Sequence, residues 1–219
     1  MNISDTATCI ARITNNGAIT SFNRGVGFFL KLGAHTVLVS NRHVIHPFES
    51  LTIEVPLKGK ITLSSEHYKS ISHKETDVDL AIVPIDRLKE DDPVFWYQIE
   101  PFVLPELCII SRQEAEHLPV MQEIAAVMML YNPTFDDVFT SVVRKGIITS
   151  PISITRDLLL TDLFCTEGNS GSPVFLLPYD GSAPRLAAIV KQRIDNGGNS
   201  MHLTLCQNAY SIADFHRWL

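Results

Sequence analysis

The most informative stretch of this chain lies near its C-terminal end and reads Glu167-Gly168-Asn169-Ser170-Gly171-Ser172-Pro173-Val174-Phe175. Ser170 has a glycine two residues before it and another directly after it, and an apolar run follows. Glycines on both sides let a carbonyl group of another molecule come close to main-chain N–H groups. Such N–H groups can form an oxyanion hole, which stabilises the charge that develops in acyl transfer. Ser170 is therefore a candidate nucleophile, and it needs a base nearby because a serine hydroxyl is inert at pH 7.

Two upstream segments offer that base and an acid to orient it. The first contains Gly25-Val26-Gly27-Phe28-Phe29-Leu30 and, after an apolar run, Ser40-Asn41-Arg42-His43-Val44. The second is Asp77-Val78-Asp79-Leu80-Ala81-Ile82-Val83. A histidine can accept the serine proton, and a carboxylate can hold that histidine in the tautomer that does so.

Together the three stretches resemble the trypsin-like serine peptidases of the chymotrypsin fold. In that family the histidine follows an apolar strand and a Gly-x-Gly-Phe segment, and the aspartate opens an apolar run. All three stretches match in family order, over roughly residues 22 to 213. The Asn-Ser-Gly-Ser-Pro wording is closer to bacterial HtrA-like and glutamyl-endopeptidase-like branches than to digestive trypsins. The resemblance implies an all-β fold of two packed six-stranded antiparallel β-barrels with a short C-terminal helix.

The resemblance also implies the roles of the site residues. His43 is the base, Asp79 the orienting acid and Ser170 the nucleophile. The backbone N–H groups of Gly168, Asn169 and Ser170, chiefly the first and the last, form the oxyanion hole. The activity that follows is hydrolysis of peptide bonds through an acyl-enzyme, with no cofactor.

Two neighbours of these residues have to be weighed against them. Asp77 and Asp79 share one face of a strand by its period of two, but the family places the acid directly before the Leu-Ala-Ile-Val run, which selects Asp79. His43 and His46 have no third ligand at a suggestive spacing, so we expect no metal.

Asn169 stands where trypsins carry an aspartate that pairs with a newly cut N-terminal amine. An amide has no charge for that pairing. The resemblance therefore implies that cleavage near the N-terminus does not switch this protein on.

The resemblance places the base of a specificity pocket at Phe164 and Cys165, and one wall on the strand from Ala188 to Arg193. We expect the pocket to be lined by Phe164, Cys165, Ala188, Val190 and Lys191. Because the base carries no aspartate, an apolar or small side chain before the scissile bond is favoured over Lys or Arg. Lys191 and Arg193 leave an acidic preference open.

Composition excludes several other classes of protein. The 219 residues carry a net charge of −6 with no basic block, which argues against nucleic acid as a partner. The longest apolar run, Ile124 to Tyr131, is far shorter than the ~20 residues of a membrane-spanning helix. The first residues lack the basic and apolar regions of a signal peptide. We therefore expect a cytoplasmic protein that does not bind membranes.

Four cysteines are present, and their spacings match no zinc pattern. They are Cys9, Cys108, Cys165 and Cys206. In a chain without a leader, scattered cysteines are expected to be free thiols. Cys165 and Cys206 both flank the predicted pocket, so we expect them to lie near each other.

The hydrophobic pattern indicates short strands separated by turns, as in an all-β barrel or sandwich. The pattern loosens between about Asp86 and Leu118, and 111–117 is typical of a short helical connector. We divide the chain into 1–110, with His43 and Asp79, and 111–219, with Ser170. The last segment, Ser211 to Leu219, predicts an amphipathic helix capped by Ser211.

The sequence therefore predicts a serine endopeptidase that acts on a protein or peptide substrate. Its restraint is expected to come from narrow specificity or from a dedicated activator or target protein. Two alternatives stay open. One is a catalytically silent binding module with the same fold, and the other is an esterase or acyl-transfer enzyme with the same triad.

Overall fold

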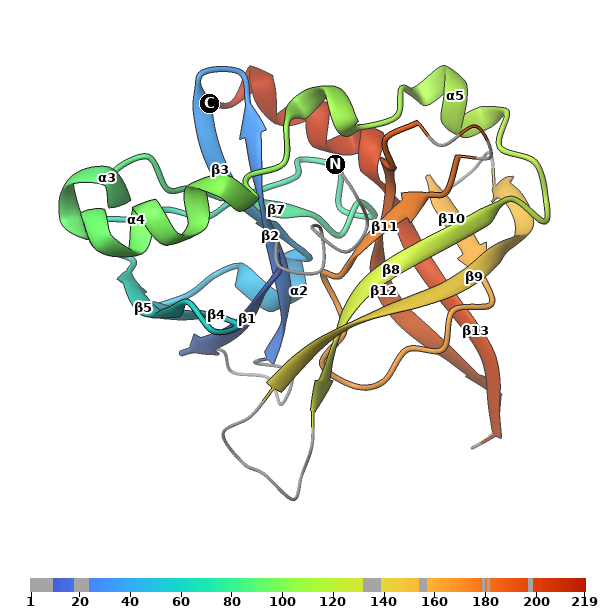
Figure 1. The fold of residues 1–219 in the computed structure, drawn as a ribbon, viewed down its shortest axis with the longest axis horizontal. Coiled ribbons are helices and arrows are strands. Elements are labelled where there is room, and N and C mark those ends of the chain that lie inside the picture. The colour runs from blue at the N-terminus through green and yellow to red at the C-terminus, as the bar shows by residue number, and fades with distance from the viewer. Residues whose placement is uncertain are drawn as a thin grey trace.

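Two β units lie side by side in the computed structural model of the chain, with helical segments and the C-terminal helix crossing above them (Figure 1). The structure describes residues 10–17, 24–131, 139–153, 157–178, 180, 182–196 and 199–219. Strands dominate both units, and the helices are short. The predicted all-β, double-barrel class is confirmed.

The N-terminal unit is an antiparallel sheet of seven strands in the order β5-β4-β1-β2-β3-β7-β6. Its strands are β1 Ile10–Asn16, β2 Arg24–Leu32, β3 His35–Ser40, β4 Ser50–Val55, β5 Gly59–Ser64, β6 Ile71–Ser72 and β7 Ala81–Pro84. Among the described residues this sheet does not close on itself, so it differs in detail from the six-stranded barrel that we expected. The short strand β6 falls inside a polar stretch with little strand character.

The middle of strand β2 is continuously apolar because both of its faces are buried. Successive side chains of a strand point to opposite faces. Phe28 and Leu30 face the core between the two units, whereas Phe29 faces the core inside the N-terminal sheet. Because both faces are covered, β2 shows no alternation of polar and apolar residues.

The C-terminal unit is a closed barrel in the order β10-β13-β12-β11-β8-β9. Its strands are β8 Glu123–Tyr131, β9 Phe139–Ser153, β10 Leu158–Thr161, β11 Pro173–Leu176, β12 Arg185–Asn196 and β13 Asn199–Asn208. Ile124, Ile148, Leu159 and Val174 fill its interior. The barrel thus buries one face of each of these strands and has six strands, as predicted.

The connector between the units is more helical than the sequence indicated. It contains α3 Leu88–Asp91, α4 Pro93–Ile99, η1 Glu100–Phe102, η2 Glu106–Cys108 and α5 Arg112–Glu116. The predicted helical connector is α5, which begins with a capping box between Ser111 and Glu114. The boundary that we expected after residue 110 falls within this segment.

The C-terminal helix η3, Ala209–Arg217, is a 3-10 helix that lies across the junction of the two units (Figure 1). Ile212 and Phe215 are fully buried there, in one cluster with residues of both units. Burying such side chains contributes about 1.5–3 kcal/mol each, so η3 helps to fasten the units together. Ser211 is buried inside the helix and does not cap it, because the helix begins two residues earlier.

None of the helices formed by the described residues is both long and apolar enough to cross a membrane.

Candidate active site

The turn that carries Ser170 is held by strands of both units. Val26 N of β2 donates to Ser170 O at 2.8 Å, and Gly171 N donates to Val190 O of β12 at 2.9 Å. Gly171 has a φ of +94°, and a Cβ there would lie 1.8 Å from Val26 O. A Cβ on Gly25 would lie 2.8 Å from Ser170 O. Glycine at both positions is therefore what lets the two units meet at the candidate nucleophile.

His43 and Asp79 form a direct pair from two segments of the N-terminal unit. His43 lies in the short helix α2, Arg42–Ile45, directly after β3, and Asp79 lies just before β7. His43 Nδ1 is 2.7 Å from Asp79 Oδ2, and His43 N donates to Asp79 Oδ1 at 3.2 Å. A carboxylate only accepts hydrogen bonds, so Nδ1 carries a proton, and in the neutral imidazole Nε2 then has the lone pair. This is the tautomer that can accept a proton from a serine.

The backbone of Asp79 is held from both units. Its carbonyl accepts from Asn41 Nδ2 at 2.9 Å and from Arg42 N at 3.3 Å. Its N–H donates to Gln207 Oε1 of β13 at 3.3 Å. Gln207 is fully buried and its Nε2 donates to Asp157 O at 3.1 Å. Gln207 thus connects the candidate acid to the C-terminal barrel, a contact that no sequence pattern indicated.

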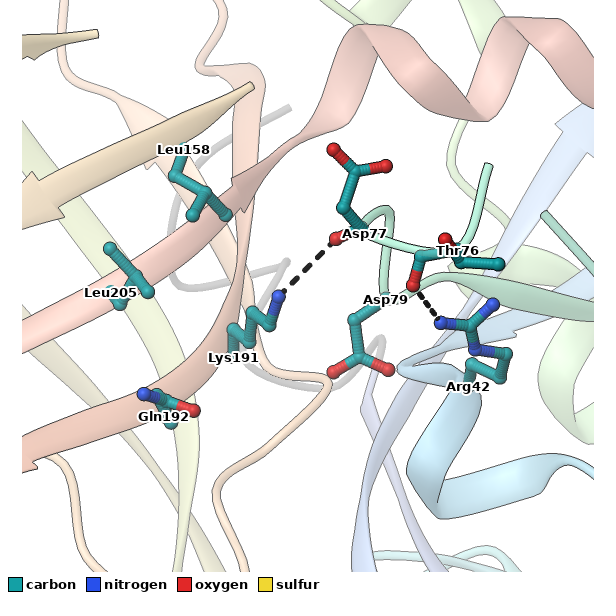
Figure 2. Close-up of a pocket in the computed structure, with 8 residues that line it drawn as sticks. All are labelled: Arg42, Thr76, Asp77, Asp79, Leu158, Lys191, Gln192 and Leu205. Atoms are coloured by element: carbon teal, nitrogen blue, oxygen red, sulfur yellow. Dashed lines mark hydrogen bonds between the residues drawn. The ribbon is translucent and has the colours of Figure 1, made fainter. Parts of the chain in front are cut away.

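Asp77 plays a different part. Its side chain is exposed, and its backbone carbonyl accepts a hydrogen bond from Lys191 Nζ at 3.4 Å. Figure 2 shows its carboxylate turned away from Asp79 and from Lys191. The structure therefore brings Asp79, and not Asp77, to His43.

The Ser170 hydroxyl donates to Lys191 O at 3.0 Å in this structure. Among the described residues, the Ser170 hydroxyl makes this hydrogen bond and no hydrogen bond to His43. Hydrogen bonds between nucleophile and base are often long or misaligned without substrate. A hydroxyl has a single proton, so Ser170 has to give up its hydrogen bond to Lys191 O before it can donate to His43.

The turn before Ser170 leaves two main-chain donors available. Gly168 has a φ of +87°, and no atom lies within 4 Å of where its Cβ would be. Asn169 N donates to Thr166 O at 3.2 Å. No acceptor within the described part of the chain meets the N–H of Gly168 or of Ser170. The available donors are the two on which the expected oxyanion hole chiefly depends, whereas the Asn169 N–H is already used.

The Asn169 side chain is buried and fully engaged. Its Oδ1 accepts from Met129 N of β8 at 3.0 Å, and its Nδ2 donates to Thr166 Oγ1 at 2.7 Å. Only 2% of the residue is exposed. The amide therefore ties the turn to the barrel wall without any charged partner.

The residues expected around a specificity pocket separate into two groups. Cys165, Ala188 and Val190 are buried and pack inside the closed barrel. These three side chains belong to the hydrophobic cluster in the interior of the barrel. Phe164 and Lys191 remain partly exposed. Of these two, Lys191 lines a cavity beside Asp79, and Phe164 is not among the residues that line it.

The described cysteines Cys108, Cys165 and Cys206 are free thiols, and Cys9 lies outside the described residues. Cys165 and Cys206 belong to one interior cluster, as predicted from their positions. Burial raises the pKa of Cys165 to about 11 and also raises that of Cys206. Neither thiol is therefore a nucleophile at neutral pH.

His46, three residues after His43, contacts a serine hydroxyl. Its Nδ1 lies 2.8 Å from Ser70 Oγ. Burial, together with the charge of Arg42, lowers the pKa of its imidazole. Within the described residues no three His, Cys, Asp or Glu side chains gather as metal ligands.

A cavity of about 420 Å³ opens between the two units beside Asp79 (Figure 2). It is lined by Arg42, Thr76, Asp77, Asp79, Leu158, Lys191, Gln192 and Leu205. The candidate acid thus forms part of one wall, and the residue that accepts the Ser170 hydrogen bond forms part of another.

The two packed β units form a chymotrypsin-like fold. One similar solved structure is the catalytically active tobacco etch virus protease complexed with product. It is 13% identical, with a TM-score of 0.65 over 99% of this chain and 80% of that chain. Another is the HtrA-type protease AlgW with a tripeptide, which is 16% identical, with a TM-score of 0.65 over 98% of this chain. The match spans 61% of the AlgW chain. No protein-family model and no curated protein matches the sequence.

Proposed function

We propose that the chain is a serine endopeptidase with His43 as base, Asp79 as orienting acid and Ser170 as nucleophile. The observation that carries the proposal is the 2.7 Å contact between His43 Nδ1 and Asp79 Oδ2. It fixes the histidine tautomer that a serine nucleophile needs. Both solved relatives are proteases, which supports peptide-bond hydrolysis as the reaction.

The reaction begins when Ser170 leaves Lys191 O and donates its proton to His43 Nε2. Ser170 Oγ attacks the scissile carbonyl carbon, and the carbonyl oxygen becomes an oxyanion. The N–H groups of Gly168 and Ser170 stabilise that charge. The imidazolium, paired with Asp79, then protonates the leaving amine, and an acyl-enzyme forms. Water, deprotonated by His43, hydrolyses it and frees Ser170.

The edge of β12 next to Ser170 is a suitable place for an extended peptide. On this side β12 pairs with β11 only as far as Ile189, whose partner is Pro173. Further along, at Lys191 and Gln192, no described strand lies beside this edge. A peptide that adds as a strand there gains main-chain hydrogen bonds and brings a carbonyl close to Ser170.

For the side chain directly before the scissile bond, we propose a small or apolar residue. Phe164 is the partly exposed side chain at the expected pocket base, and the Arg144 guanidinium lies 5.3 Å from its ring centre. Cys165, Ala188 and Val190 support the pocket from inside the barrel rather than line it.

We further propose a reducing compartment, the cytoplasm, and control by an activator or target protein. Three free thiols support the first point. The second is supported by the hydrogen bond from Ser170 to Lys191 O, which defines a resting state. A ligand that prefers the state with Ser170 turned to His43 would shift that equilibrium.

The same hydrogen bond favours one alternative, a silent binding module in which Ser170 never turns to His43. A fluorophosphonate probe distinguishes the two, because it reacts only with an activated serine. We expect labelling of the parent chain and none in Ser170→Ala or His43→Ala. Labelling that persists in Ser170→Ala excludes this nucleophile, and an unlabelled parent chain supports the silent module. Cleavage of a peptide library then separates a peptidase from an esterase.

A further inference from the structure

Lys191 occupies an irregular position in β12 that redirects its side chain. In the pairing of β12 with β13, Val190 faces Cys206 and Gln192 faces Leu205, so Lys191 is an extra residue between them. Such a bulge interrupts the alternation of side chains and can aim one in a new direction. Here it directs Lys191 into the cavity between the two units (Figure 2).

The Lys191 ammonium lacks a charged partner in the cavity. Its hydrogen bond is to Asp77 O at 3.4 Å, and no carboxylate of the described residues lies within 4.0 Å of it. Asp79 also lines the cavity, and both of its carboxylate oxygens already accept from His43. An ammonium has three donors, so at least two remain for a ligand.

The rest of the cavity suits the stem of an acidic side chain. Leu158 and Leu205 provide apolar surface on the barrel side. The Arg42 guanidinium donates to Thr76 O on the opposite side, and the Asp77 carboxylate points away from the ammonium (Figure 2). A volume of about 420 Å³ accommodates a side chain together with water. The lining carries two cations, Arg42 and Lys191, and two carboxylates, Asp77 and Asp79. Of the two cations, Lys191 is the one that lies on the side of the leucines (Figure 2).

We propose that this cavity is a second specificity subsite, in which Lys191 binds the carboxylate of an Asp or Glu of the substrate. The proposal rests on the proposed function, since it assumes a peptide at Ser170. The acidic residue is not the one directly before the scissile bond, because the cavity lies on the Asp79 side and not at Phe164. A half-exposed pair of this kind contributes little, so we expect a preference of about threefold.

The test uses binding, so that it does not depend on turnover. The Ser170→Ala chain is immobilised and a randomised hexapeptide library is passed over it at low salt. The retained peptides are identified by mass spectrometry. We expect Asp and Glu to be enriched about threefold at one position. The enrichment should be lost when Lys191→Met is added, kept with Lys191→Arg and replaced by enrichment of Lys and Arg with Lys191→Glu.

Lys145→Met is the matched control, because Lys145 lies on β9 with 72% of its side chain exposed and does not line the cavity. It should leave the acidic enrichment intact. Circular dichroism confirms that each variant is folded. Acidic enrichment that is equal with and without the Lys191→Met change, or that survives Lys191→Glu, overturns the subsite. Fluorophosphonate labelling of the chain that retains Ser170 is measured separately, so failure of the peptidase mechanism is recognised on its own.

Discussion

At the residue scale, Asp79 determines which nitrogen of His43 carries a proton. An asparagine at position 79 could donate its amide N–H to Nδ1 and so favour the wrong tautomer. We expect Asp79→Asn to lower kcat by ~10⁴, as such a change does in a serine-protease triad. Asp77→Asn removes an exposed carboxylate that does not contact His43 and should cost far less. Steady-state kinetics on both variants measure the two losses of kcat. A larger loss in Asp77→Asn than in Asp79→Asn would mean that the acid is Asp77.

The residues that local sequence patterns single out differ in a physical way from those whose position only the structure reveals. His43, Asp79 and Ser170 lie in short patterns of glycine and apolar residues that can be recognised in the sequence alone. Gln207 and the direction of Lys191 depend on long-range contacts. An ordinary glutamine in a strand gives no sign that its amide will meet the backbone of a residue 128 positions away. A bulge likewise arises from the pairing of two strands, which one strand alone does not encode.

At the element scale, β13 positions the acid through Gln207. Gln207→Met keeps the volume but removes both the acceptor for Asp79 N and the donor to Asp157 O. Small displacements of catalytic groups can cost ~10²-fold, and we expect a loss of kcat of that order. KM should change little, and the acidic limb of the kcat/KM pH profile should move, since it reports the free enzyme's base.

Thr161→Val is the control for a purely structural effect of Gln207→Met. Thr161 is fully buried in the same barrel, and its hydroxyl donates to Thr204 O at 3.3 Å without contacting the site. It should lower the melting temperature but leave the pH profile in place. If both variants lower stability and neither moves the pH profile, Gln207 has only a structural role.

The helix α5 makes a pH-dependent contribution to stability. Hydrogen bonds from the Ser111 backbone, and then from Arg185, hold the pKa of Glu114 at about 2, below its ordinary value of 4.5. A depressed pKa stabilises the folded state above pH 4.5, and this contribution is lost as the pH falls towards 2. Glu114→Gln should therefore melt below the parent at pH 6, and the gap should narrow below pH 4.5. Glu116→Gln, on the same helix, controls for the loss of one charge. A gap that is constant with pH would contradict the assignment.

The sequence predicts strands and helices where the hydrophobic pattern is periodic, and it does not reveal them where that pattern is short. The strand β1 has only seven residues and ends in two asparagines, which resemble a loop. The helix α4 was missed although Asp92 accepts a hydrogen bond from Phe95 N and Pro93 opens the first turn. An aspartate followed by proline is a usable start signal, but the aromatic residues behind it favour strand by propensity.

At the scale of the whole molecule, the sequence predicts two β units but not how each one closes. Closure depends on strand tilt and register around the whole sheet. The C-terminal unit closes with six strands, and the N-terminal sheet stays open among the described residues. A shared hydrophobic core holds the two units together. Phe28 of β2, Phe175 of β11 and Phe215 of η3 lie in one cluster.

The stability of the molecule should not depend on disulfides. Cys165 and Cys206 lie inside the barrel as thiols, and Cys108 is partly buried. The melting temperature should be the same with and without strong reductant. Alkylation of the native chain should spare Cys165 and Cys206, because burial raises their pKa and denies access to the reagent. Alkylation after unfolding without reductant should modify every cysteine. A melting temperature that falls on reduction would reveal a structural disulfide.

The turn at Ser170 is set by the barrel itself, through Asn169. Because its amide oxygen accepts from Met129 N and its amide nitrogen donates to Thr166 Oγ1, Asn169 is already held in place and offers no charge to an N-terminal amine. Removing residues 1–9 should therefore leave both turnover and fluorophosphonate labelling unchanged at equal folded concentration. Asn169→Leu, in contrast, leaves the Met129 N–H unpaired, which costs about 1–3 kcal/mol and should displace the turn and reduce labelling. A large gain in turnover on truncation, with the new amine protected from acylation, would show that the site is completed by a chain terminus after all.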